Sequence, residues 1–198
     1  MNATAAIFGQ SFSDDPLRAA FLKWQCRVRQ LGMRDNEGRP DDATSPDLIL
    51  DGETQSMGCI ITLMNKSAAA SLVPEMLHIA RQTNDPAQRR SKALQFLSAT
   101  YYQKHTEFSD ILTATFPAHS LGAEKILASP KCTLVYEVYA QRFDLQCTVH
   151  RLTDHNPLYQ STLAHNRLFN PNLSADIIVL GFEPDWAAST ATPPFGAR

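Results

Sequence analysis

The chain has 198 residues, of which 43% are hydrophobic and 19% charged, and its formal net charge is −2 at pH 7. This composition is typical of a soluble globular protein, and it excludes a wholly disordered chain, a collagen and a coiled coil. A chain of this length buries enough surface to fold without a disulfide or a metal ion. We expect a single α+β domain over 14–186, a flexible leader over 1–13 and a flexible tail rich in Pro, Thr and Ala over 187–198.

The two longest predicted helices, over 15–31 and 85–104, each open with an Asp-Pro pair. Asp is a good helix N-cap, and Pro fits the first helical position. Apolar residues then recur at helical spacing in both segments, which predicts one buried stripe on each helix. We expect these two helices to be the largest packing elements.

Shorter elements are predicted between and after these helices. The apolar run Leu48–Leu50, which stops at the turn signal Asp51-Gly52, and the run Met57–Met64 are typical of strands. Residues 72–82 fit either a helix or a strand, and we favour the helix. Thr106 is expected to cap a short helix over 108–116, and Ser120 another that ends near residue 127.

The clearest strand signal lies over 131–152, where buried-type and polar residues alternate from Phe143 to His150. This period of two predicts an antiparallel pair of strands that turns near residues 140–142. A helix over 156–168 and a last strand over 177–182 follow. We therefore predict an antiparallel or mixed sheet of about five strands, with helices packed mainly on one face.

Charge is segregated in the first quarter of the chain, with basic residues over 18–39 and acidic residues over 41–53. Lys23, Arg27 and Arg34 form a basic ridge on the first predicted helix, and Arg39 lies shortly after it. These four residues are the candidate partner-binding residues. The ridge suits phosphate groups or an acidic partner, although a solvated helix face beside the acidic segment is the simpler interpretation.

A second candidate site, for a small ligand, consists of His150, Asp154, His155 and His165. A strand end and the following helix would bring these residues together. The zinc-binding patterns HExxH and HxH are absent, and surface histidines are the simpler interpretation. We predict no metal and no cofactor.

The standard catalytic and nucleotide-binding motifs are absent, including the glycine-rich phosphate loops and the GxSxG elbow. The four cysteines are too far apart for a CxxC motif, and we expect reduced, mostly buried thiols. No segment is long and apolar enough to span a membrane, and the N-terminus does not resemble a signal peptide. We therefore expect a cytoplasmic protein.

These observations favour a soluble non-catalytic interaction protein, such as an accessory subunit, an adaptor or an assembly component, that binds a protein partner. The alternative is a small-molecule-binding domain or an enzyme without a standard motif. A third hypothesis is RNA or DNA binding through the basic helix, against which the balanced overall charge argues. Whether the chain is an enzyme stays open, with the missing motifs arguing against it, and a homo-oligomer also stays open.

Overall fold

A computed structural model of the chain describes residues 15–34, 46–56, 62–65, 69–85, 87–89, 92, 108–138, 141–169, 172–173 and 175–192. The helices whose two ends are described are α2 (Pro16–Arg34), α3 (Ala69–Gln82), α5 (Leu121–Ala128) and α6 (Pro157–Phe169). The strands are β1 (Asp47–Leu50), β2 (Glu53–Ser56), β3 (Thr62–Asn65), β4 (Phe108–Pro117), β5 (Lys131–Val138), β6 (Gln141–Leu152), β7 (Ile177–Pro184) and β8 (Thr190–Thr192).

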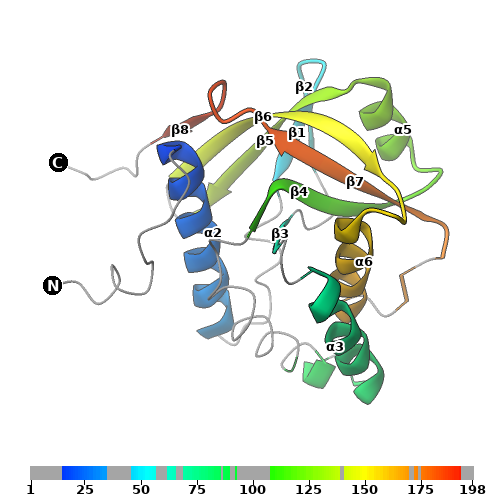
Figure 1. Cartoon of the computed structure of the whole chain (residues 1–198). Coiled ribbons are helices and arrows are strands. Elements are labelled where there is room, and N and C mark those ends of the chain that lie inside the picture. The colour runs from blue at the N-terminus through cyan, green and yellow to red at the C-terminus, as the bar shows by residue number, and fades with distance from the viewer. Residues whose placement is uncertain are drawn as a thin grey trace, which may run out of the picture.

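The strands form one sheet in the order β2-β1-β5-β6-β7-β4-β3, with β8 paired to β6 (Figure 1). Every described pair of neighbouring strands is antiparallel. The prediction of an α+β domain built on an antiparallel sheet is therefore confirmed. In the described part of the chain the sheet has eight strands, however, where the sequence predicted about five.

Most of the predicted elements are present. The helix predictions are confirmed by α2, α3, α5 and α6, and the Ser120 hydroxyl caps α5 by accepting a hydrogen bond from the backbone N–H of Ala123. The strand predictions are confirmed by β1, β5, β6 and β7. The turn after β1 has positive φ at Asp51 and Gly52, as a tight hairpin of type I′ requires.

One element was predicted wrongly. Residues 108–116, expected as a helix, belong to strand β4. The segment carries apolar residues at a spacing that also fits a helix. In the strand, Leu112, Ala114 and Phe116 lie on one face of the sheet, and the residues between them lie on the other. Pairing of β4 with β7 decides between the two structures, because it satisfies the backbone groups of both strands.

Other predicted elements differ from the structure in part or are only partly described. Strand β2 was not predicted, and of the strand expected over 57–64 the structure describes β3 alone. Of the helix expected over 85–104, the structure describes helical residues at 87–89 and 92. The segment expected as a flexible tail contains β8, which pairs with β6, and residues 193–198 lie outside the described part.

Strand β6 is the centre of the sheet. Its residues 141–148 pair with β5 along one edge. Along the other edge, residues 147–152 pair with β7 and residues 142–144 pair with β8. Since paired residues put their side chains on the same side of the sheet, the register of β6 decides which residues of its three neighbouring strands share a face.

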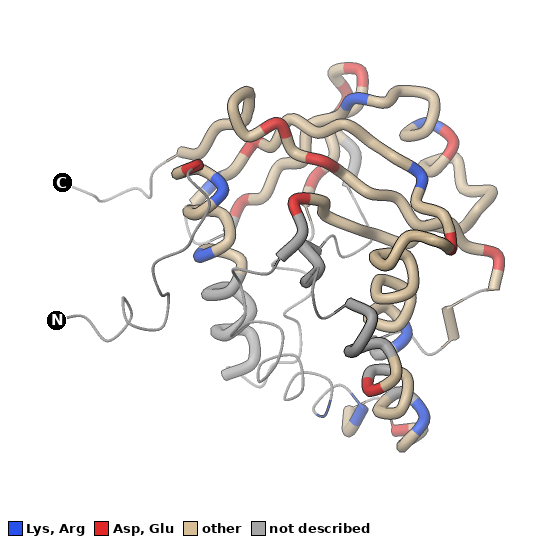
Figure 2. The backbone as a smooth tube through the Cα atoms, in the orientation of Figure 1, with Lys and Arg blue, Asp and Glu red and all other residues tan. Residues whose placement is uncertain are grey.

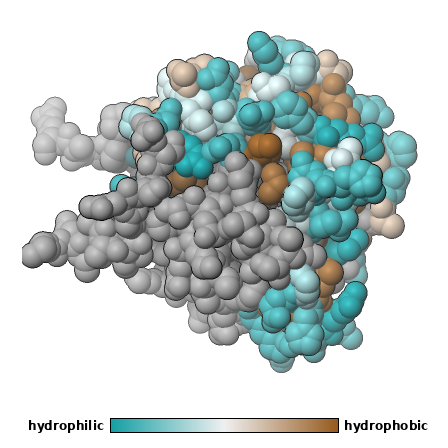
Figure 3. Space-filling view, viewed as in Figure 1, coloured by the Kyte–Doolittle hydropathy of each residue, from teal (hydrophilic) through white to brown (hydrophobic). Residues whose placement is uncertain are grey.

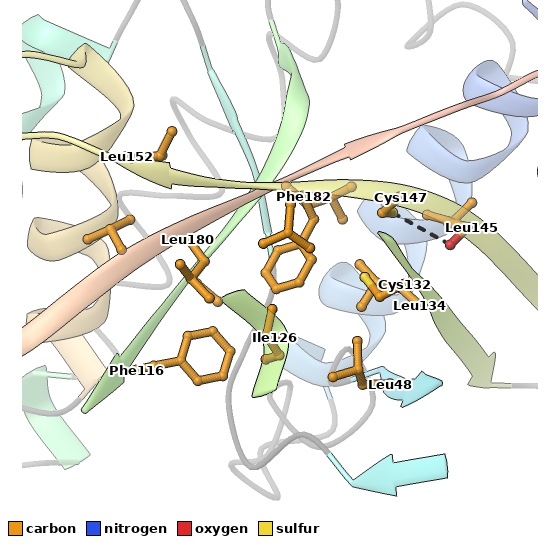
Figure 4. Close-up of a cluster of buried hydrophobic side chains, with 14 of the residues drawn as sticks. Leu48, Phe116, Ile126, Cys132, Leu134, Leu145, Cys147, Leu152, Leu180 and Phe182 are labelled. Carbon is orange, nitrogen blue, oxygen red and sulfur yellow. Dashed lines mark hydrogen bonds between the residues drawn. The ribbon is translucent and has the colours of Figure 1, made fainter. Parts of the chain in front are cut away.

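The register defines two faces, which we name after one residue on each. The Phe182 face carries the buried side chains of Phe182, Leu180, Leu112, Ala114, Val149, Cys147, Leu145, Phe143, Cys132, Leu134 and Tyr136. The Thr113 face carries the alternate residues of the same strands. Figure 4 shows part of the cluster on the Phe182 face, where Ile126 of α5 lies among the strand side chains.

Helix α2 packs on the Phe182 face through an aromatic cluster. The Phe21 ring lies 5.2 Å from Tyr136, 5.3 Å from Phe143 and 5.8 Å from Trp24, measured between ring centroids. Phe21 is fully buried, and Trp186, which follows β7, packs against it at 5.9 Å. Edge-to-face ring pairs of this kind add to the free energy gained by burying the rings.

Helix α6 packs on the opposite, Thr113 face. The hydroxyl oxygens of Thr162 and Thr113 lie 2.7 Å apart, and both side chains are buried. The Thr162 hydroxyl also bonds to the Leu158 carbonyl one turn earlier, at 2.6 Å. Helix α3 packs against α6. The helices are thus divided between the two faces rather than packed mainly on one.

Gly181 of β7 lies in the crowded part of the Thr113 face. A Cβ atom at this position would lie 2.8 Å from Cγ2 of Ile111 and 3.2 Å from Cδ2 of Leu152. Contacts below 3 Å are repulsive, and Ile111 belongs to a strand and is stiff because it branches at Cβ. The close packing of β4, β7 and β6 at this point therefore requires glycine.

We predict that Gly181→Ala lowers the free energy of unfolding by about 1–3 kcal/mol, because the added methyl group overpacks the face. The measurement is urea unfolding of both proteins. Gly122→Ala in α5 is the matched control, since no atom lies within 4 Å of a Cβ at that position. The control should be neutral or more stable, by up to about 1 kcal/mol. A Gly181→Ala protein as stable as the control would contradict the described register.

Candidate functional site

The first candidate surface is the outward side of α2, which we call the α2 stripe: Lys23 together with helix positions 27 and 34. Lys23 is exposed, whereas Phe21, Leu22 and Trp24 are buried. At about 100° per residue, positions 27 and 34 fall within about 40° of Lys23 around the helix. The basic residues Arg27 and Arg34 thus occupy positions on the same side of α2 as Lys23.

The described residues test this prediction only in part. The side chains of Arg27 and Arg34, and the whole of Arg39, lie outside the described part of the chain. Arg18, on the first turn of the helix, does not belong to the stripe. It is buried, and its Nε donates to Oδ1 of Asp110 at 2.5 Å, which joins the start of α2 to β4.

Aromatic contacts, rather than a complete set of hydrogen bonds, hold the inner side of α2. Within the described part of the chain, the indole N–H groups of Trp24 and Trp186 and the side-chain amide nitrogen of Gln25 are buried without an acceptor. Leaving a buried donor unsatisfied costs about 1–3 kcal/mol each. The aromatic contacts around Phe21 therefore offset a polar cost at the place where the helix meets the sheet.

The second candidate group, His150, Asp154, His155 and His165, is spread over three environments. His150 lies on β6, half-exposed, with Nε2 3.0 Å from Oε2 of Glu183 on β7. His155 is exposed in the turn before α6, 3.6 Å from Asp154. His165 is buried in α6, with 3% of its surface exposed. Among the described residues, no three His, Cys, Asp or Glu side chains gather as a metal-binding group.

Glu183 is a site residue that the sequence reasoning missed. It stands beside His150 because Thr148 and His150 of β6 pair with Glu183 and Gly181 of β7. The two residues are 33 positions apart in the chain, and only the pairing register joins them. The alternation in β6 was visible in the sequence, but the register of its partner strand was not.

His150 and Glu183 belong to a larger polar area, which we call the open sheet area. It is the part of the Thr113 face on β5, β6 and the end of β7. Its polar members are Lys131, Thr133, Glu137, Arg142, Asp144, Gln146, Thr148, His150 and Glu183. Figure 2 shows acidic and basic residues interspersed along these strands.

Hydrogen bonds tie the polar side chains of the open sheet area to one another. Thr133 Oγ1 donates to Oε1 of Gln146 at 3.0 Å, and Arg142 Nε donates to Oδ1 of Asp144 at 2.7 Å. The Asp144 contact raises the pKa of the Arg142 guanidinium, so Arg142 keeps its positive charge. The area carries no Phe, Tyr or Trp side chain, which removes the stacking platforms on which sheet-type RNA-binding domains depend.

The surface seen in Figure 3 is mostly hydrophilic over the described strands, with small apolar spots between polar groups. The exposed large apolar side chains among the described residues are Leu121 and Leu127, both on α5.

No described helix is long and apolar enough to cross a membrane. No family model, curated protein or solved structure matches the chain.

We predict that the candidate histidines differ in chemical accessibility. Acylation with diethyl pyrocarbonate, followed residue by residue with mass spectrometry, should modify His155 quickly in the folded protein. His150 should react more slowly, because its Nε2 is engaged with Glu183. His165 should react only when the protein is unfolded in urea. Equal rates at His155 and His165 in the folded protein would contradict the described burial of α6.

Proposed function

We propose that this chain is a non-catalytic interaction protein, an accessory subunit, an adaptor or an assembly component, that binds an acidic protein partner through the α2 stripe. The observation that carries the proposal is the orientation of α2. Its aromatic side is buried against the sheet while Lys23, on the opposite side, is exposed. A rigid helix with three basic positions on its outward side suits an acidic surface.

The sheet on which α2 rests supports this proposal. The helix is fixed at its start by the ion pair of Arg18 with Asp110 and along its inner side by the rings around Phe21. A helix held in this way keeps its basic positions in place. Binding a partner at this surface therefore costs little conformational entropy in the helix. We also propose a cytoplasmic location, because the sequence offers no apolar segment long enough to span a membrane.

The small-molecule or enzyme alternative now rests on His150 and Glu183. The other members of that candidate group lie apart from this pair, in the turn before α6 and inside α6. A histidine and a carboxylate 3.0 Å apart are a possible acid–base pair. The third hypothesis, nucleic acid, lacks aromatic stacking groups on the open sheet area and would rest on the α2 stripe alone.

The test begins with native mass spectrometry of the protein purified gently from its own host. The proposal predicts a second chain at fixed stoichiometry. A bare chain carrying a fixed small mass would favour the ligand alternative instead. A nucleic-acid partner would show an affinity that falls steeply with salt.

The triple variant Lys23→Glu, Arg27→Glu, Arg34→Glu then tests the surface. We predict that it weakens the complex by about tenfold or more, because each substitution turns an attraction into a repulsion. The matched control is the triple variant Lys125→Glu, Lys131→Glu, Arg151→Glu. It changes the net charge equally at exposed positions outside α2 and should bind as the unmodified chain does. Full binding by the first triple variant would refute the α2 stripe as the interface.

A further inference from the structure

Two thiols face each other across the central pair of strands. Cys132 of β5 and Cys147 of β6 are direct register partners, so their side chains lie on the same, Phe182 face. Both cysteines are free and buried, with 6% and 4% of their surfaces exposed. Figure 4 shows the two side chains in one cluster, where the Cys147 thiol donates to the Leu145 carbonyl at 3.5 Å.

The hydrogen bonds of β6 define the kind of pair that the two cysteines form. The Val149 N–H donates to the Pro130 carbonyl at 2.8 Å, so β6 turns its odd-numbered backbone groups toward β5. Gln146 turns the other way, since its carbonyl accepts from the Asp185 N–H and its own N–H donates to the Ser189 hydroxyl. Cys132 and Cys147 are therefore a hydrogen-bonded pair.

The Cα spacing of such a pair lies within the range that disulfides span. Cα atoms of a hydrogen-bonded antiparallel pair are about 5.5 Å apart. Disulfides span Cα separations of about 4.4–6.8 Å, most often about 5.5–6 Å. A disulfide also needs Cβ atoms about 3.5–4.5 Å apart, whereas Cβ atoms of directly opposite residues lie about 4.5–5.5 Å apart, so the two strands move slightly closer as the bond forms.

We propose that Cys132 and Cys147 form a reversible intramolecular disulfide. This bond is a redox-dependent covalent link between β5 and β6 on the Phe182 face, opposite the open sheet area. The oxidant is a small disulfide such as oxidised glutathione. One thiolate attacks it, forms a mixed disulfide and expels one glutathione thiolate. The second thiolate attacks the protein sulfur of the mixed disulfide and expels the other. The two protons lost by the cysteines go to the two glutathione thiolates, and the protein is oxidised by two electrons.

The surroundings of the two thiols determine when this reaction occurs. Burial raises the pKa of Cys132 to about 12. Burial also raises the pKa of Cys147 well above its ordinary value, and the neighbouring Cys132 raises it further. Thiols in the closed structure are therefore protonated and shielded, and oxidation follows local opening of the sheet or accompanies folding.

The tryptic map of this chain makes the product easy to identify. Cleavage after Lys131, Arg142 and Arg151 places Cys132 in peptide 132–142 and Cys147 in peptide 143–151. The full-length chain is equilibrated with reduced and oxidised glutathione at a series of ratios, in buffer and in 8 M urea. Free thiols are then alkylated and the digest is analysed without reduction. The intact mass, also without reduction, separates a bond within one chain from a bond between two chains.

We expect the joined peptides 132–142 and 143–151 from a monomeric chain, and an oxidation equilibrium at least about tenfold more favourable in buffer than in urea, because the fold holds the pair together. A Cys26→Ser, Cys59→Ser variant should give the same product, and Cys132→Ser should abolish it. If the double variant does not fold, the map of the unmodified chain decides alone.

Three outcomes would overturn the proposal. The two thiols could stay free in buffer at glutathione ratios that join them in urea, Cys132 or Cys147 could bond to Cys26 or Cys59, or the bond could link two chains.

Discussion

The alternation of side chains along β6 is the constraint on which the rest of the structure depends. Phe143, Leu145, Cys147 and Val149 are buried on one face, and the residues between them are more exposed on the other. A slip of one residue would move this whole apolar set into water. Burial of a set of this size stabilises by several kcal/mol, at about 25 cal/mol per Å² of apolar surface, so one register is strongly preferred. The neighbouring strands β5, β7 and β8 must then fit that register.

The binding surfaces of the protein follow from this register. The Phe182 face offers Tyr136 and Phe143 to the rings of α2, and thereby fixes which side of that helix faces outward. The Thr113 face is covered by α6 at β4, whereas most of its described side chains on β5 and β6 are exposed or half-buried. The same register puts His150 beside Glu183 and Cys132 opposite Cys147. The proposed partner surface and the proposed disulfide are thus on different elements, but both are oriented by one strand.

The sequence was informative where the signal is local. Asp15 and Ser120 mark helix starts by accepting hydrogen bonds from the backbone of the following turn, and the alternation of β6 is a pattern of neighbouring residues. It was uninformative where the outcome depends on a distant partner. The apolar spacing of β4 also fits a helix, and only its pairing with β7 makes it a strand. The three residues of β8 are all exposed, so this strand buries no apolar face that the sequence could reveal. The neighbour of His150 likewise depends on strand register, which composition does not encode.

The most direct test of the central claim is the register of β5 on β6 in solution, measured as nuclear Overhauser contacts between α-protons in a labelled sample. In an antiparallel pair, the α-protons of residues that are not hydrogen bonded to each other lie close together. The account predicts contacts of Thr133 with Gln146 and of Val135 with Asp144. Contacts shifted by one residue would separate Cys132 from Cys147, turn the apolar side of β6 outward and contradict the account.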